Sequence, residues 1–424
     1  MGSVSRRALL LAGGGAAVLG GGAMIASGGP PEIPLYSATV ALRSLTERVL
    51  VEPGREDRLV PGTRVLAGTE DTDRLVEDEA RWLAHARVPR VSGLEELRTS
   101  ALLDLRVLTA GLPAAVAGWS PQWRFAWPRD NAFIAVALAE LGDLEGALAQ
   151  LHFFEGIASP GQWLPARVDP WTRAVPDSRP PQFDGLAWLL WAASRLLDAG
   201  AEPARVAALA PLWSTLTDTL LGALVAGVPP VSPDYWEVDE SALTLGSAAA
   251  TVAGLAGAAK VLEASGDRAR SELAAAAASA LRSGIAADFA PDYPRHQGGA
   301  DPCASIAFLA PPVADQATPF AGVASALAAA EVRMRRSAGG LAPGAGWRDD
   351  GISWTPETAL VALAWAGLGE QGRARSLLTW LQAHRTAAGS LPEKVLYDGR
   401  PAAVAPLGWT AALCLLALRR LDEG

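Results

Sequence analysis

The stretch ESALTLGSAAATVAGLAGAAKVLEA, residues 240–264, has almost no polar surface over 25 residues. Its three charged residues, Glu240, Lys260 and Glu263, lie toward its ends, and small or apolar residues occupy every face of the helix that it predicts. A helix that is apolar all round is buried on all sides. The stretch therefore predicts a helical protein in which an inner layer of helices is enclosed by an outer one.

Segments with helical periodicity fill most of the remaining chain. They are rich in alanine and leucine, and several end at a glycine such as Gly142 or Gly200, where a helix can stop in a left-handed residue. The segments predicted to be helical are 35–50, 73–86, 93–110, 131–141, 144–157, 183–199, 203–225, 240–264, 267–288, 302–309, 319–333, 356–366, 371–384 and 404–420.

This pattern indicates an all-α fold of one class, the six-hairpin (α/α)₆ barrel, in which two concentric rings hold six helices each. The segments supply both rings and one or two helices of a short N-terminal extension. No motif recurs at a fixed period, which argues against a solenoid. Short β-hairpins are expected only at 58–68 and around Asp398–Gly399. We expect residues 31–424 to form a single barrel domain.

Residues 1–30 have the pattern of a targeting segment. The positively charged MGSVSRR precedes ALLLAGGGAAVLGGGAMIA, residues 8–26, which contains no charge. The SRRALLL sequence resembles a twin-arginine export signal, so the twin-arginine export machinery is an expected partner. Two alternatives remain open: the segment is cleaved, or residues 8–26 are retained as a membrane anchor. In either case the body of the protein is expected to be extracellular or in the cell envelope.

Composition argues against several function classes. The net charge is −9 and the basic residues are scattered, so nucleic acid is not an expected partner. The four histidines stand far apart, and neither a metal site nor a cofactor is expected. Cys303 and Cys414 lie among apolar residues and are expected to be buried free thiols, with a disulfide between them left open. Neither a G-x-S-x-G serine hydrolase motif nor a phosphate-binding P-loop occurs.

The long connections between helices combine aromatic rings with charged groups. A pyranose ring has apolar faces that stack on tryptophan and a rim of hydroxyls that carboxylates and guanidinium groups can bind with paired hydrogen bonds. This composition therefore favours a carbohydrate site. The connections with this character are 118–131, 163–185, 228–240, 342–357 and the shorter 389–399.

Four motifs go further than composition. GWSPQWRFAWPRDNAF, DYWEVDE, WRDDGISW and LPEKVLYDGRPAAVAPLGW resemble glycoside hydrolase family 15, the glucoamylase-like enzymes, and they occur in the family's order. The resemblance runs from about Leu102 to the C-terminus. It implies the same (α/α)₆ barrel that the helical segments indicate, and an exo-acting glycosidase that cleaves an α-glucosidic bond with inversion.

The resemblance implies two catalytic carboxyl groups. Glu237 in YWEVDE matches the general acid, which protonates the leaving oxygen, and Glu393 in LPEKV matches the general base, which activates water. The residues that match positions contacting the sugar or lining the subsite are Trp127, Arg129, Asp130, Gln182, Asp184, Trp236, Arg348 and Trp354.

Structural roles compete with some of these assignments. Asp130 has the residue type and position of an N-cap for the helix at 131–141. Glu237 and Glu393 are also compatible with ordinary helix-end and surface positions, and Arg348 with an ion pair to a neighbouring aspartate. Two neighbours depart from the family: Val238 follows the acid, where a second glutamate is common, and Lys394 follows the base, where glutamine is common.

Other functions remain open on the same fold. A non-catalytic barrel that binds sugar or protein at the cell envelope is one alternative, and a trehalose hydrolase or glycosyl transferase is another. The segment between the leader and Leu102 is too short for the β-sandwich domain of bacterial relatives, which favours a short oligosaccharide or disaccharide as substrate.

Overall fold

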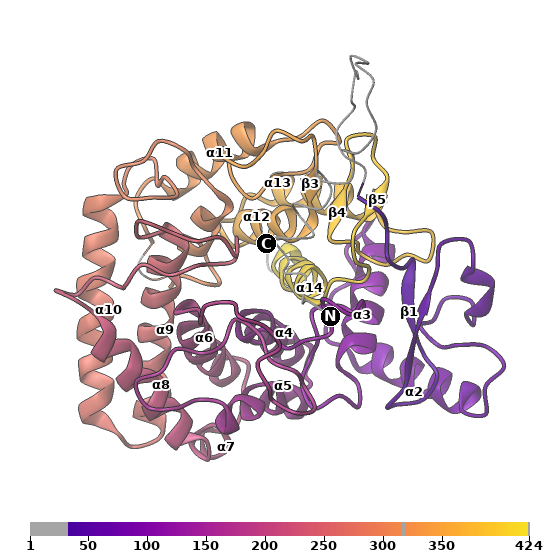
Figure 1. Cartoon of the computed structure of the whole chain (residues 1–424), viewed down its shortest axis with the longest axis horizontal. Coiled ribbons are helices and arrows are strands. Elements are labelled where there is room, and N and C mark those ends of the chain that lie inside the picture. Colours follow the sequence, from indigo (N-terminus) through magenta and orange to yellow (C-terminus); the bar gives the residue numbers. More distant parts are fainter. Residues whose placement is uncertain (1–32, 316, 318, 423–424) are drawn as a thin grey trace, which may run out of the picture.

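The computed structural model describes residues 33–315, 317 and 319–422 (Figure 1). The segment predicted to be an export signal or anchor lies outside the described residues. The described chain forms the predicted (α/α)₆ barrel, in which each outer helix is followed by an inner one.

The inner ring closes on itself, because each of its helices packs against the next and the last packs against the first. Its members are almost entirely buried, and α14 lies near the middle of Figure 1. The inner elements are α4 (Pro128–Leu141), α6 (Asp184–Asp198), α9 (Leu245–Ala264), the 3₁₀ helix η3 (Ala304–Leu309), α12 (Thr355–Gly367) and α14 (Gly408–Asp422).

The outer helices pack against the inner ring with one apolar face and turn the other toward solvent. They are α3 (Glu95–Thr109), α5 (Leu144–His152), α8 (Ala210–Ala223), α10 (Arg268–Asp288), α11 (Val323–Met334) and α13 (Gln371–Ala383). The shorter helices η2 (Phe153–Gly156) and α7 (Pro203–Ala207) lie in connections, and α7 is labelled at the lower edge of Figure 1.

Helix α9 is the buried helix that residues 240–264 predicted, although it begins later, at Leu245, where Thr244 caps it by accepting a hydrogen bond from the Ser247 N–H. Its glycines allow close packing on α6, since a Cβ atom at Gly254 would lie 2.5 Å from the Ala187 Cα. By length and composition α9 is apolar enough to cross a membrane, but 78% of its apolar window is buried inside the barrel. The apolar composition therefore reflects its place in the inner ring.

Aromatic side chains fill the middle of the ring. The ring of Phe133 lies 4.7 Å from that of Trp191, 5.1 Å from that of Trp188 and 6.3 Å from that of Phe308, which belongs to η3. These large side chains occupy the space around the short element η3 and separate the two ends of the barrel.

The N-terminal extension corrects one prediction. Residues 35–50 were expected to be helical, but they contain β1 (Thr39–Leu42) and most of β2 (Arg48–Val51), which pair antiparallel with Thr39 opposite Val51. The helical interpretation is wrong because both short strands contain two β-branched residues each and the Ser44 hydroxyl accepts hydrogen bonds from backbone N–H groups in the turn between them. Helix α2 (Thr72–His85), which follows η1 (Glu56–Arg58), packs against α3.

Both predicted hairpins are present. In the first, the N–H of Val60 donates to the carbonyl of Val65 at 3.0 Å. The second is formed by β4 (Lys394–Val395) and β5 (Pro401–Ala402), and β3 (Ser353–Trp354) joins it to make a small antiparallel sheet. Cys303 and Cys414 are buried free thiols, as expected.

Candidate functional site

The connections that enter the inner helices all lie at one end of the barrel, where these helices have their N-termini. Helix α4 shows how a site residue is placed there: Trp127 occupies the N-cap and Pro128 the first helical position. The expectation that Asp130 caps this helix is therefore wrong. Asp130 instead lies within the first turn, where a carboxylate is stabilised by the helix dipole.

Glu237 is held by side chains from two other connections. Its Oε1 accepts a hydrogen bond from the Trp127 indole N–H at 2.9 Å, and its Oε2 accepts one from Arg179 at 2.8 Å. Arg129 lies 3.7 Å from Oε1. The backbone of Glu237 is in the left-handed region, with φ of 54°. Strained positions of this kind are held by surrounding contacts and cluster at functional sites.

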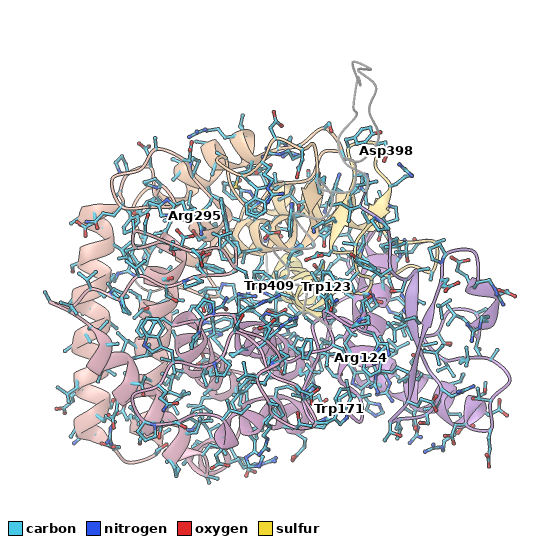
Figure 2. All side chains as sticks on the ribbon, in the orientation of Figure 1. Trp123, Arg124, Trp171, Arg295, Asp398 and Trp409 are labelled. Atoms are coloured by element: carbon cyan, nitrogen blue, oxygen red, sulfur yellow. The ribbon has the colours of Figure 1, made fainter. Side chains whose placement is uncertain are left out.

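Arg129 lies beside Glu237 and has hydrogen-bond donors that no protein group uses. It is 2% exposed, pairs with Asp130 at 3.1 Å, and stacks 5.0 Å from the ring of Trp409. Its Nε and Nη1 atoms are buried without a hydrogen-bond partner. Figure 2 shows Trp409 and Trp123 near the middle of the molecule in that view. A buried guanidinium with unused donors suits a ligand that supplies hydroxyl oxygens.

Asp184 provides the matching acceptor at the start of α6. Its Oδ2 accepts a hydrogen bond from the Trp188 indole at 3.1 Å, and its Oδ1 is buried without a partner. Burial raises the pKa of Asp184 to about 6, with smaller contributions from the negative charges of Asp234 and Glu237, while Arg129 acts in the opposite direction. Gln182, at the end of the same connection, is also buried, and its backbone N–H donates to the Leu164 carbonyl.

Glu393 is fixed by the backbone on both sides of its chain. Its N–H donates to the Val404 carbonyl at 2.8 Å, and its carbonyl accepts from the N–H of Thr355 at 3.0 Å. The side chain is 1% exposed, and its Oε2 lies 3.7 Å from the Lys394 ammonium. The position is therefore not that of a surface loop glutamate.

A line of tryptophans links the two glutamate-bearing connections. Trp236 packs edge-on against Trp347 with ring centroids 4.8 Å apart, and Trp347 packs in the same way against Trp354 at 5.5 Å. The Lys394 ammonium then lies 4.2 Å from the ring of Trp354. Since Trp236 precedes Glu237 and Lys394 follows Glu393, these contacts bring both glutamates to one aromatic-walled region.

A second set of contacts joins the same connections from the N-terminal extension. Tyr36, Trp123, Trp127 and Val404 pack in one cluster, with the rings of Tyr36 and Trp123 5.5 Å apart. Burial and the negative charge of Glu393 raise the pKa of the Tyr36 phenol. Tyr36 thus lies near Glu393, while Trp127 from the same cluster binds Glu237.

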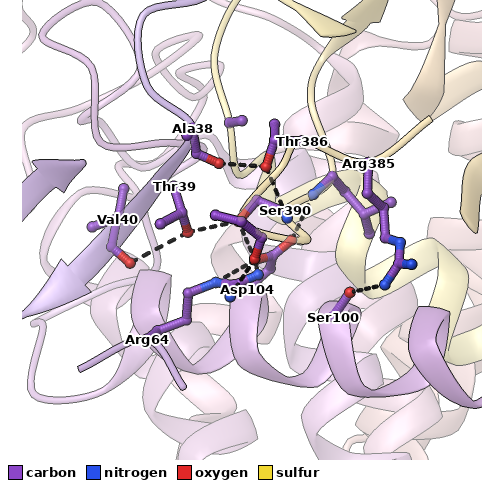
Figure 3. Close-up of polar contacts among 12 residues, drawn as sticks. Ala38, Thr39, Val40, Arg64, Ser100, Asp104, Arg385, Thr386 and Ser390 are labelled. Atoms are coloured by element: carbon purple, nitrogen blue, oxygen red, sulfur yellow. Dashed lines mark hydrogen bonds and ion pairs between the residues drawn. The ribbon is translucent and has the colours of Figure 1, made fainter. Parts of the chain in front are cut away.

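Asp104 anchors the connection that carries Glu393 (Figure 3). Its Oδ1 accepts a hydrogen bond from the Ser390 hydroxyl at 2.7 Å, and its Oδ2 accepts one from the Leu391 N–H at 2.8 Å. Arg64 from the N-terminal extension pairs with Asp104 at 3.0 Å, and both side chains are buried. The extension therefore positions the loop before Glu393 as well as supplying Tyr36.

The sequence-predicted residues differ in how they meet. One group of residues in mutual contact consists of Trp127, Arg129, Asp130 and Glu237. The charges of Arg129 and Glu237 also affect the pKa of Asp184. Trp127 is fully buried, so it contributes to the site as a hydrogen-bond donor to Glu237.

Arg348 was predicted to line the sugar-binding subsite. It directly follows Trp347 in the chain, and its side chain is exposed. Its role in binding sugar therefore stays a prediction.

Four residues of this region were not predicted. Trp347 and Trp409 lie inside the quoted WRDD and PLGW motifs, so the motifs contained the signal but no role was assigned to them. Arg179 immediately precedes PPQFDG, and only its contact with Glu237 reveals it. Tyr36 lies in the segment interpreted as a helix, which hid its place beside the barrel.

The chemistry available here is that of carboxylates. Within the described part of the chain no group of three or more histidine, cysteine, aspartate or glutamate side chains is arranged to hold a metal ion. One buried and one half-buried glutamate, a buried aspartate and several indole and guanidinium donors can together bind hydroxyls and transfer protons.

Comparisons with known proteins agree on the fold. No family model matches the chain, and no curated protein matches it. Among solved structures, a glycosidase variant in complex with glucose is 21% identical, with a TM-score of 0.65, over 79% of this chain and 99% of that one. A bacterial glucoamylase complexed with acarbose is 16% identical, with a TM-score of 0.67, over 83% and 59% of the two chains. A glucoamylase from Saccharomycopsis fibuligera is 15% identical, with a TM-score of 0.60, over 80% and 97%. The TM-scores and coverages establish a shared barrel fold, and at identities this low they establish the fold alone.

Proposed function

We propose that the protein is an exo-acting glycoside hydrolase that cleaves an α-glucosidic bond with inversion. The observation that carries the proposal is the placement of Glu237 and Glu393, whose side chains are 6% and 1% exposed and which are joined through the tryptophans between them. Two carboxyl groups on opposite sides of a glycosidic bond are what this chemistry requires. The named structural neighbours, a glycosidase with glucose and a glucoamylase with acarbose, support a glucose-containing substrate.

In this proposal Glu237 is the general acid. It donates a proton to the glycosidic oxygen as the bond between that oxygen and the anomeric carbon breaks. Trp127 and Arg179 fix its two oxygens, so the proton is presented in one direction. Fixed orientation of the acid removes an entropic cost from the step.

Glu393 is the general base on the opposite face of the sugar. It accepts a proton from water as the water oxygen bonds to the anomeric carbon, which inverts the configuration and yields β-glucose from an α-glucoside. Its backbone hydrogen bonds and the Asp104 anchor hold this carboxylate in place. Arg129 and Asp184, which have a spare donor and a spare acceptor, bind hydroxyls of the terminal sugar.

The same proposal places the enzyme outside the cytoplasm. The twin-arginine pattern and the uncharged residues 8–26 support export, followed either by release or by retention at the envelope. A disaccharide or short oligosaccharide is the proposed substrate.

The test is an NMR time course of the purified protein with a panel of α-linked glucose disaccharides. β-Glucose is expected as the first-formed anomer. Glu237→Gln and Glu393→Gln should each reduce kcat about 10²- to 10⁴-fold, the usual contribution of general acid–base catalysis. Glu140→Gln, at the other end of the barrel, is the matched control and should keep its activity.

Three outcomes would redirect the assignment. First-formed α-glucose would exclude inversion. Turnover of trehalose alone, or transfer of glucose to a second sugar, would favour a trehalose hydrolase or a glycosyl transferase on the same fold. Sugar binding without turnover of any glucoside would favour a non-catalytic barrel.

A further inference from the structure

Trp171 is the exposed aromatic residue on the connection that leads to the proposed site. Half of its surface, 50%, is accessible to solvent, whereas the nearby Trp119 is 6% exposed. Figure 2 shows Trp171 toward the lower edge of the molecule, away from Trp409.

The chain presents Trp171 rigidly. The Asp169 carboxylate accepts hydrogen bonds from the N–H groups of Trp171 at 3.0 Å and Thr172 at 2.8 Å. The Asp169 N–H donates to the Ala174 carbonyl at 2.9 Å, which closes the turn. The backbone at Trp171 is therefore fixed before any ligand arrives, which reduces the conformational entropy lost on binding.

Trp119 packs against the Trp171 ring. The two rings meet edge to face, with centroids 6.2 Å apart and planes at 78°. Arg124 in turn stacks 4.3 Å from the Trp119 ring and donates to the Trp119 carbonyl. This packing fixes one side of Trp171 and leaves the rest of the ring in solvent.

Both rings lie on connections that converge on the proposed site. Trp119 precedes α4, and Trp171 precedes α6, so they lie at the end of the barrel where Glu237 is held. An ion pair at 2.5 Å joins Arg167, before Trp171, to Asp177, after it, and the connection then supplies Arg179 to Glu237. A ligand that extends from the cleavage point along this connection would reach Trp171.

We propose that Trp171 is a stacking platform for those glucose units of an α-linked oligosaccharide that lie distant from the bond that is cleaved. The apolar face of a pyranose matches one exposed indole. A protein partner fits less well, because a stable interface buries about 800 Å² on each side. The turn between Asp169 and Asp177 offers only Trp171 and Val175 as exposed large apolar residues.

This inference rests on the proposed glycosidase activity, and its test is chain-length dependence. The full-length chain is compared with Trp171→Ala and Trp171→Phe on the series from maltose to maltoheptaose. The ratio of kcat/KM for maltoheptaose to kcat/KM for maltose should fall about 2- to 10-fold in Trp171→Ala, the fold-change that corresponds to one stacking contact. Trp171→Phe, which keeps a ring, should restore part of that ratio.

Val175→Ser is the matched control, since Val175 is 54% exposed on the same turn and has no ring. The control should keep the wild-type ratio. A wild-type ratio in Trp171→Ala would overturn the platform while leaving the glycosidase proposal intact, and would direct attention to a protein or surface partner.

A binding measurement tests the Trp171 platform independently of the glycosidase activity. β-Cyclodextrin has no chain end for an exo-acting enzyme to cleave, so its binding can be followed by calorimetry in the Glu393→Gln variant. Adding Trp171→Ala to that variant should weaken β-cyclodextrin binding by a similar 2- to 10-fold factor. A weakening of this size would support the platform even if no glucoside were hydrolysed, and unchanged affinity would contradict it.

Discussion

The two ends of the inner ring use the same helices but differ in their electrostatics. At the end where the inner helices begin, Arg129, Asp184 and Trp409 have buried polar atoms without hydrogen-bond partners. At the other end lies a cavity of about 910 Å³ between α6, α9, α10 and α12. The described chain therefore has a large cavity far from its concentration of spare hydrogen-bonding groups.

The charged residues around the far cavity are already paired. Glu140 accepts hydrogen bonds from Arg420 at 2.7 and 3.0 Å and lies 3.6 Å from Arg195, while Asp198 binds Arg195 and Lys260. Helix C-termini carry partial negative charge, which basic side chains offset. These arginines therefore have a structural role that needs no ligand.

The opposite arrangement holds at the near end. Asp130, Asp184 and Glu357 lie in the first turns of inner helices, where the helix N-termini carry partial positive charge. The ring thus gives carboxylates a favourable field at one end only. The direction of the helices, more than the size of a cavity, therefore marks the end suited to carboxylate chemistry.

The largest expected effect on stability comes from the anchor of the near end. Asp104→Asn should lower the free energy of unfolding by about 3–5 kcal/mol, because it leaves Arg64 buried without its charged partner. Chemical denaturation monitored by circular dichroism measures this. Asp198→Asn is the far-end counterpart: its carboxylate is 34% exposed, and the expected change is about 1 kcal/mol or less. Equal losses in the two variants would contradict the distinction between the ends.

Asp184 should make the near end sensitive to pH. Its pKa is raised from 3.8 to about 6, so between these values the folded protein binds more protons than the unfolded chain. The stability that this group contributes is present below pH 3.8 and is lost as the pH rises toward 6. Relative to Asp184→Asn, the wild type should therefore lose about 3 kcal/mol between pH 3.5 and 7, since each pKa unit corresponds to about 1.4 kcal/mol.

Denaturation midpoints of the two proteins at several pH values test this. A difference between them that does not change with pH would show that Asp184 has an ordinary pKa.

Two buried tryptophans offer a narrower test. Trp127→Phe removes the donor to Glu237 and should lower kcat about 10- to 100-fold, the equivalent of a hydrogen bond to a charged group at about 1.5–3 kcal/mol. Trp191 lines the far cavity, and its indole N–H has no partner. Trp191→Phe should therefore change kcat less than about 3-fold, well below the cost of such a bond. Steady-state kinetics on equal amounts of folded protein would show whether the two substitutions differ.

The sequence was sufficient to predict the barrel because helical periodicity is visible within each short segment. Each apolar segment, such as residues 240–264, shows the periodicity of a single helix, and the number of these segments indicates the two rings. The segment 35–50 misled because short strands with few residues leave a weak period, and pairing across a turn decides their structure. The pairing of the N-terminal extension with the barrel is likewise not visible in any local pattern.

The candidate site was predicted unevenly for a related reason. Motifs identified Glu237 and Glu393 because these residues lie in short conspicuous stretches. These stretches are also contacted by residues far away in the chain, namely Arg179, Tyr36 and Asp104. No spacing of residues in the sequence predicts such contacts. Their roles follow only from distances and burial in the folded chain.

The smallest effects should come from changes of packing at each end. Gly344→Ala would place a Cβ atom 2.6 Å from the Trp236 ring and 2.9 Å from the Cys303 Cβ, so the ring beside Glu237 has to shift. A shift of this kind should lower kcat/KM several-fold, since misplacement by about 1 Å costs up to about 100-fold. Ala253→Leu adds volume to the wall of the far cavity, where space exists, and should leave kcat/KM unchanged. A loss of activity in Ala253→Leu equal to that in Gly344→Ala would mean that the aromatic side chains in the middle of the ring couple the two ends.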